Sequence, residues 1–143
     1  MTVTINGTTG IEGPNASGDT VINGVTVGTG AGDIATNTAV GVSALAANTT
    51  GAYNTAVGYQ ALDVNTEGIR NTSIGQGSMG LNTTGTRNTV VGDNALKTNV
   101  SGSYNVAVGQ AALENNTASN NVAVGYTALQ TNSSGTINVR SGS

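Results

Sequence analysis

A tandem repeat of 17 residues occupies most of this chain of 143 residues. The unit NTAVGYQALDVNTEGIR, for example, fills residues 54–70. Six copies follow one another, the fifth one residue short, and they open at Asn37, Asn54, Asn71, Asn88, Asn105 and Asn121. A repeat of this length buries its apolar face only by stacking on its neighbours. The chain is therefore expected to fold as a stacked array of identical units.

Four columns of the repeat hardly vary when the opening Asn is counted as position zero. Position three holds Val40, Val57, Ile74, Val91, Val108 and Val124. Position four holds Gly41, Gly58, Gly75, Gly92, Gly109 and Gly125. Position eight holds Leu45, Leu62, Met79, Leu96, Leu113 and Leu129. Position eleven holds Asn48, Asn65, Asn82, Asn99, Asn116 and Asn132.

These columns predict one lap of a β-solenoid for each repeat, and hence an all-β fold. Positions one to three form a short strand, with positions one and three on one face and position two on the other. We expect the Val or Ile at position three to face inward and to form the repeat core together with Leu or Met at position eight. The glycine at position four turns a corner where a Cβ would be in the way. A helix is disfavoured because Gly, Val-Gly and Asn-Thr recur in every unit.

The asparagines at position eleven are expected to lie above one another along the solenoid. Side-chain amides one strand apart can bond to one another as a ladder. Removal of one Asn is then expected to leave its neighbours with unpaired amide groups.

The chain divides into four parts on this interpretation. Residues 37–137 are the six repeats, and residues 138–143 begin an incomplete seventh lap. Residues 24–36 form an atypical first coil, since Val27-Gly28 matches Val40-Gly41. Residues 1–23 form an N-terminal cap or attachment arm, with Pro14 and Asn-Gly turn signals at Asn6-Gly7 and Asn23-Gly24. As a cap, residues 1–23 would cover the first open edge of the sheet, whereas the C-terminal edge needs cover from a partner or from mates in an oligomer.

Composition argues against several classes of function. Four cations in a chain of net charge −3 offer no patch for nucleic acid. The chain contains no Cys and no His, so no metal site, bound cofactor or disulfide is expected. No signal peptide or run of 18 apolar residues is recognised, so neither export nor membrane insertion is expected.

Candidate chemical groups are few, and no catalytic residue is assigned. Asp63 and Glu67 resemble a carboxylate pair but are interpreted as solvated surface charge. The segment GTGAGD at residues 28–33 lacks the Lys of a phosphate loop and the tandem copies of a calcium roll, so it is interpreted as a tight corner. Tyr59 and Tyr126, both at position five, are candidate contacts for a glycan, although packing along the coil edge is the commoner role. We therefore expect a protein that is not an enzyme.

The unit NTAVGYQALDVNTEG resembles the N-T-A-[VI]-G-Y-x-A-L-x-x-N-T-x-G repeats of phage tail-fibre proteins, and TVTINGTTGI resembles N-termini in that group. More distantly, the repeats are similar to those in the head of trimeric autotransporter adhesins, which form a trimeric left-handed β-roll. The resemblance implies a left-handed parallel β-roll, a homotrimer, and a structural role in a virion as a module of a tail or capsid fibre. It also implies synthesis in the host cytoplasm, binding to other virion proteins through residues 1–23 or the C-terminal end, and contact with a host surface glycan.

A trimer is also expected on physical grounds, because a lap this small buries little apolar surface by itself. We expect the Leu column at position eight to lie at the trimer axis, with the Ala or Ser column at position seven allowing close approach.

Two other functions remain open. One is the head fragment of a bacterial trimeric adhesin, which the absence of a signal peptide and a membrane anchor disfavours. The other is an ice-binding solenoid, which needs an outward threonine ladder. The Thr column at position one changes to Val106 and Val122, as an inward-facing position would, which argues against ice binding.

Overall fold

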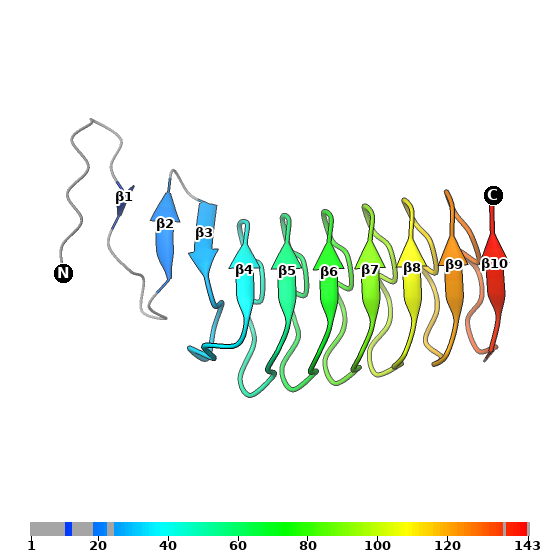
Figure 1. Ribbon diagram of the computed structural model, residues 1–143, viewed down its shortest axis with the longest axis horizontal. Coiled ribbons are helices and arrows are strands. Elements are labelled where there is room, and N and C mark those ends of the chain that lie inside the picture. The colour runs from blue at the N-terminus through cyan, green and yellow to red at the C-terminus, as the bar shows by residue number, and fades with distance from the viewer. Residues whose placement is uncertain (1–10, 13–18, 23–24, 136, 143) are drawn as a thin grey trace.

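The computed structural model describes residues 11–12, 19–22, 25–135 and 137–142, and these contain strands and turns but no helix. Ten strands form one sheet in chain order (Figure 1). They are β1 (Ile11–Glu12), β2 (Thr20–Ile22), β3 (Val25–Gly28), β4 (Thr38–Val40), β5 (Thr55–Val57), β6 (Thr72–Ile74), β7 (Thr89–Val91), β8 (Val106–Val108), β9 (Val122–Val124) and β10 (Val139–Ser141). The prediction of an all-β parallel solenoid with laps of about 17 residues is confirmed.

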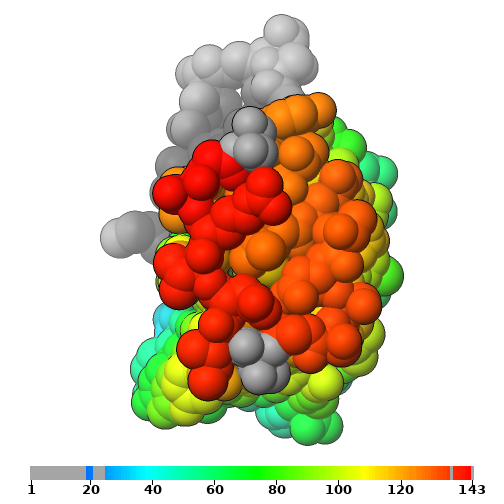
Figure 2. All heavy atoms as spheres, turned by 90° about the vertical axis from the view of Figure 1, so that its right-hand side faces the viewer, coloured from blue at the N-terminus to red at the C-terminus, as the bar shows by residue number. Residues whose placement is uncertain are grey.

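Each lap contains one strand, and the strands from β4 to β10 pair in parallel. The register joins equal positions of successive laps, as in Thr55↔Thr72 and Val57↔Ile74. The laps therefore lie behind one another with similar outlines when the molecule is viewed from the end that carries β10 (Figure 2).

The rest of each lap consists of turns that also bond to the neighbouring laps. The Gln60 N–H donates to the Val42 carbonyl of the preceding lap at 3.0 Å, and the Leu62 N–H donates to the Ser78 carbonyl of the following lap at 3.1 Å. Both Gln60 and Leu62 have positive φ, 55° and 51°. A left-handed residue costs about 1–2 kcal/mol when it is not glycine. Lap-to-lap bonding repays this cost, since it satisfies backbone groups that would otherwise be buried without partners.

The core contains three side-chain columns from each lap. Position two contributes Ala39, Ala56, Ser73, Val90, Ala107 and Ala123. Position seven contributes Ala44, Ala61, Ser78, Ala95, Ala112 and Ala128. The large side chains are those of position eight, where Leu45, Leu62, Met79, Leu96 and Leu113 are fully buried and Leu129 is partly buried.

The predicted inward orientation of position three is wrong. Position two faces inward, so the flanking residues of each strand, at positions one and three, face outward. Position-three exposure reaches 38% at Val91 and 44% at Val124, and Val40, Val57, Ile74 and Val108 also lie at least partly on the surface. The physical reason is the packing inside the lap, where position two, Ala or Ser in five repeats and Val90 in the fourth, packs in one core with the large side chain of position eight.

Two further expectations fail for the same reason. The Leu column and the small column at position seven are already enclosed within each chain, so they cannot form a trimer axis. The Thr column at position one faces outward, so the argument that it is an inward position is also wrong.

The glycines at position four turn the corner after each strand. Their φ angles lie between 128° and 143°, a region that L side chains rarely adopt. They also stack closely, and a Cβ on Gly58 would lie 2.6 Å from the Gly75 carbonyl oxygen. Both the conformation and the spacing require glycine here.

The position-eleven asparagines form a buried amide ladder. Asn65 donates to Asn48 Oδ1 at 3.1 Å, Asn82 donates to Asn65 Oδ1 at 2.8 Å, and Asn99 donates to Asn82 Oδ1 at 3.1 Å. The ladder stops at Asn99, whose Oδ1 has no partner. In the short fifth lap the Asn116 amide donates to the Ala118 carbonyl at 2.8 Å and not to Asn99. The ladder then resumes, with Asn132 donating to Asn116 Oδ1 at 3.1 Å.

The opening asparagines at position zero form a second buried column. The Asn71 N–H donates to Asn54 Oδ1 at 3.0 Å, and the Asn71 side-chain amide donates to the Gly85 carbonyl at 2.8 Å. Both asparagine columns thus hold the N-T-x-G turn against the core, since the side-chain amides of Asn71 and Asn82 both donate to the Gly85 carbonyl.

The segment before the repeats differs from the predicted first coil. Strand β3 pairs antiparallel with β2 and with β4, with Val27 opposite Val40 and Gly28 opposite Ala39. The described part of the segment 24–36, residues 25–36, is therefore not a lap in the direction of the others, although the Ala31 N–H bonds to the Leu45 carbonyl at 3.0 Å. Reversing the strand covers one open edge of the solenoid. Asn6-Gly7, Pro14 and Asn23-Gly24 lie outside the described residues.

Gly58→Ala is expected to lower the free energy of unfolding by about 3 kcal/mol, because it adds a left-handed strain and a backbone clash. The control is Gly77→Ala, because position six also has positive φ but carries Ala111 in another lap. The control is expected to lose about 1–2 kcal/mol, the cost of the left-handed conformation alone. Urea denaturation measures both, and equal losses would contradict the corner assignment.

Asn82→Ala is expected to cost about 2–3 kcal/mol, since it leaves Asn65 Oδ1 unpaired and removes a partner of Asn99. Thr84→Ala, an exposed change in the same turn, is expected to stay within about 0.5 kcal/mol of wild type. Thermal and urea unfolding compare the two variants. Equal free energies of unfolding for the two variants would show that the amide ladder does not stabilise the fold.

Candidate functional site

The outer sheet face, formed by positions one and three of β4 to β9, is an uncharged surface of the solenoid. Position one contributes Thr38, Thr55, Thr72, Thr89, Val106 and Val122. Position three contributes Val40, Val57, Ile74, Val91, Val108 and Val124. Parallel in-register pairing sets these side chains in two straight rows. An uncharged surface of this kind, with a full row of Val and Ile beside a row that is mostly Thr, is a candidate interaction site.

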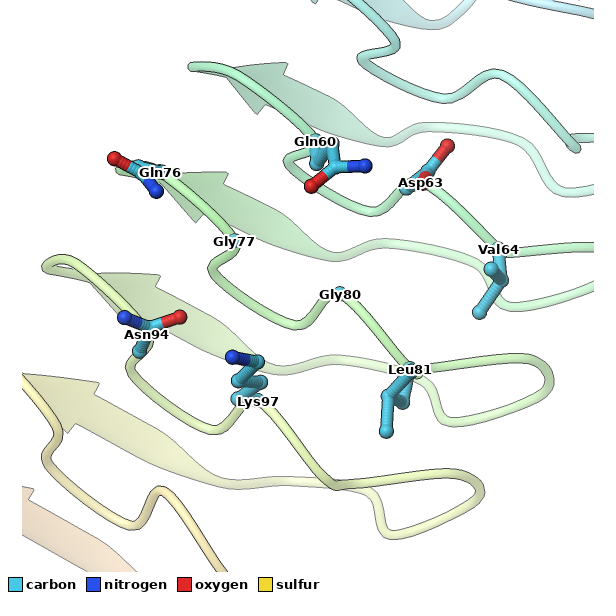
Figure 3. A pocket seen from close by; sticks show the side chains of 9 residues that line it. All are labelled: Gln60, Asp63, Val64, Gln76, Gly77, Gly80, Leu81, Asn94 and Lys97. Atoms are coloured by element: carbon cyan, nitrogen blue, oxygen red, sulfur yellow. The ribbon is translucent and has the colours of Figure 1, made fainter.

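A second feature is a hollow of about 200 Å³ on another side of the third repeat, which we name the lap-three hollow. It exists because position six is Gly77 and position nine is Gly80 in this repeat alone. The lining residues are Gln60, Asp63, Val64, Gln76, Gly77, Gly80, Leu81, Asn94 and Lys97. Figure 3 shows the laps that carry Gln60-Asp63 and Asn94-Lys97 on opposite sides of the two glycines.

The lap-three hollow combines opposite charges with neutral amides. Asp63 and Lys97 occupy position nine of the second and fourth repeats, one on each side of Gly80. Burial raises the pKa of the Asp63 carboxyl above its ordinary value. The Asn94 side-chain amide donates to Asp93 Oδ1 at 3.0 Å, which leaves the Asn94 oxygen as an acceptor near Gly77.

Glu67, considered together with Asp63 as a carboxylate pair, lies exposed in the outer turn and does not line the hollow. The structure therefore does not bring these two acids into one cleft, as a glycosidase pair would require.

The segment GTGAGD at residues 28–33 bonds to a carboxylate of its own chain. The Thr29 N–H donates to Asp19 Oδ1 at 2.6 Å, and the Gly30 N–H donates to Asp19 Oδ2 at 3.1 Å. Gly30, Gly32 and Asp33 have positive φ. Such a loop of amides binds an anion, and here Asp19, itself buried, supplies it.

Tyr59 and Tyr126 are exposed, but they lie four laps apart, a separation of about 19 Å at the strand spacing. They do not form one site.

The other two tyrosines, Tyr53 and Tyr104, pair with cations at position sixteen, which the sequence did not lead us to expect. The Arg70 guanidinium lies 5.3 Å from the centre of the Tyr53 ring, and Arg87 lies 5.4 Å from that of Tyr104. The sequence contains a signal for these pairs, because position sixteen carries Tyr53, Arg70, Arg87 and Tyr104 in successive repeats.

No group of three or more His, Cys, Asp or Glu side chains in the described ranges could hold a metal ion. The same ranges contain no helix of the length and apolarity needed to cross a bilayer. Searches of protein-family models, curated proteins and solved structures find no match to this chain. The outer sheet face and the lap-three hollow are the two candidate sites of this solenoid.

Proposed function

We propose that this chain is a structural module of a phage fibre, a left-handed β-solenoid that assembles as a homotrimer through its outer sheet face. The observation that carries the proposal is the two uncharged rows of Thr, Val and Ile on that face. Three equal faces can close around a threefold axis, which excludes water from all of them and leaves no further copy to add.

The face suits contact between copies more than contact with solvent. A position that needs only solubility would carry charge, yet β4 to β9 present none at positions one and three. The residues are β-branched and lie in register, so each lap offers the same shape to the corresponding lap of a mate. The contact grows with every repeat, which gives a stiff, elongated assembly.

The placement in a virion rests on the resemblance of the repeat to those of tail-fibre proteins. Residues 1–23 or the C-terminal end would then attach the module to other virion proteins. The scarcity of titratable groups supports a structural role over a catalytic one. The head of a bacterial trimeric adhesin, the alternative, would use the same trimer and differ in its attachment to a cell surface.

Native mass spectrometry is expected to find a trimer of the 14.0 kDa chain. Val91→Lys places a charge on the outer sheet face and is expected to give folded monomers. Val100→Lys is the matched control, because Val100 is exposed at position twelve and lies outside that face, and it is expected to remain trimeric. A wild-type monomer, or a Val91→Lys trimer, would refute the proposed interface.

Ice binding is a second candidate, favoured by one observation, the outward Thr column of β4 to β7 at regular strand spacing. The two functions exclude each other, since a trimer would cover that column. We expect no thermal hysteresis from the wild-type protein. Hysteresis that Thr72→Lys abolishes and Val100→Lys preserves would replace the fibre proposal with the ice-binding one.

A further inference from the structure

We infer that the lap-three hollow binds one neutral pyranose ring of a glycan. The inference goes beyond the structural role and does not depend on the trimer, since the hollow and the outer sheet face involve different positions of the repeat.

The hollow is a local departure from an otherwise regular array. Positions six and nine carry Gln60 and Asp63 in the second repeat, and Asn94 and Lys97 in the fourth. Gly77 adopts the same left-handed conformation as Gln60 and Asn94, with φ values of 59°, 55° and 53°. The backbone therefore does not require glycine here. What the two glycines provide is space.

The polar groups around that space match a ring of hydroxyl groups. Gln60, Gln76 and Asn94 each have a carbonyl that accepts and an amide that donates. A sugar hydroxyl also donates and accepts, so it can pair with an amide in both directions. Asp63 accepts and Lys97 donates, so the lining offers both acceptors and donors to the hydroxyl groups of a sugar.

Charge balance favours a neutral ligand. The lining contains one carboxylate, Asp63, and one ammonium, Lys97, which together give no net charge. An anion would gain from Lys97 and lose from Asp63, and a cation would do the reverse. Burial already raises the Asp63 pKa, so a donor hydroxyl that reaches its carboxylate would replace part of the lost hydration.

Shape and size agree with a single ring. Val64 and Leu81, consecutive members of position ten, supply an apolar end against which the C–H face of a pyranose can pack (Figure 3). The volume of about 200 Å³ lies below the roughly 300–1,000 Å³ typical of sites for drug-sized ligands. Gln76 and Leu81 are exposed, so the hollow opens to solvent and the ring can belong to a longer chain.

The test is an NMR titration of the ¹⁵N-labelled full-length chain with methyl glycosides of glucose, galactose, mannose and N-acetylglucosamine. At least one glycoside is expected to shift the amide signals of Gly77, Gly80 and Asn94. Inorganic phosphate and N-acetylneuraminic acid serve as charged probes and are expected to cause no shift there. The inference would be overturned if none of the four glycosides shifted these amide signals, or if only the charged probes did.

A double variant, Gly77→Gln with Gly80→Asp, fills the hollow with the side chains of the preceding lap. It is expected to keep the circular dichroism spectrum of wild type and to raise the dissociation constant at least about tenfold. Thr127→Gln with Gln130→Asp makes equivalent changes at positions six and nine of the sixth repeat and is expected to bind as wild type does.

Lys97→Met keeps the apolar stem of the side chain and removes a donor, so it gives a second readout should the filled variant fold poorly. It is also expected to weaken binding about tenfold. Wild-type affinity in both the filled variant and Lys97→Met would overturn the inference.

Discussion

Hydrogen bonding between equal positions of successive laps is the constraint on which the rest of this structure depends. Because β4 to β10 pair without any shift of register, each side chain lies over its counterpart one lap away. The corner glycines then stack backbone against backbone, which excludes a Cβ. The same stacking brings asparagine amides within bonding distance and holds Leu62 and its counterparts in a left-handed conformation that an isolated chain would avoid.

Sequence reasoning found the period, the strand and the corner because each leaves a direct mark on residue choice. It assigned the wrong face of the strand to the interior, since position two and not position three is buried. Alternation tells which positions share a face, but the interior is chosen by the packing inside the lap, where Leu62 and Ala56 pack in one core. The left-handed conformation of the leucines at position eight could not be predicted either, because hydrogen bonds between laps and not local preference set it. Knowledge that a lap encloses one large side chain would have corrected the orientation.

The two irregular repeats show what the constraint allows. Deletion of one residue from the fifth repeat keeps β8 and β9 paired, yet it interrupts the amide ladder and leaves Asn99 Oδ1 without a partner. The changes at Gly77 and Gly80 leave all lap-to-lap pairing in place, since the Gly77 N–H still bonds to the Tyr59 carbonyl at 2.9 Å. Interior columns thus keep a few residue types, whereas positions six and nine each carry a different residue in every repeat.

This difference separates assembly from recognition within one lap. Positions one and three repeat the same uncharged, β-branched residue types, so any contact they make extends along the whole solenoid. Positions six and nine vary from lap to lap, so a ligand site built from them belongs to one place and requires three neighbouring laps to form its floor and walls. A solenoid of near-identical units can therefore bear a unique site only where its sequence departs from the repeat, and the third repeat carries the glycine pair that opens such a site.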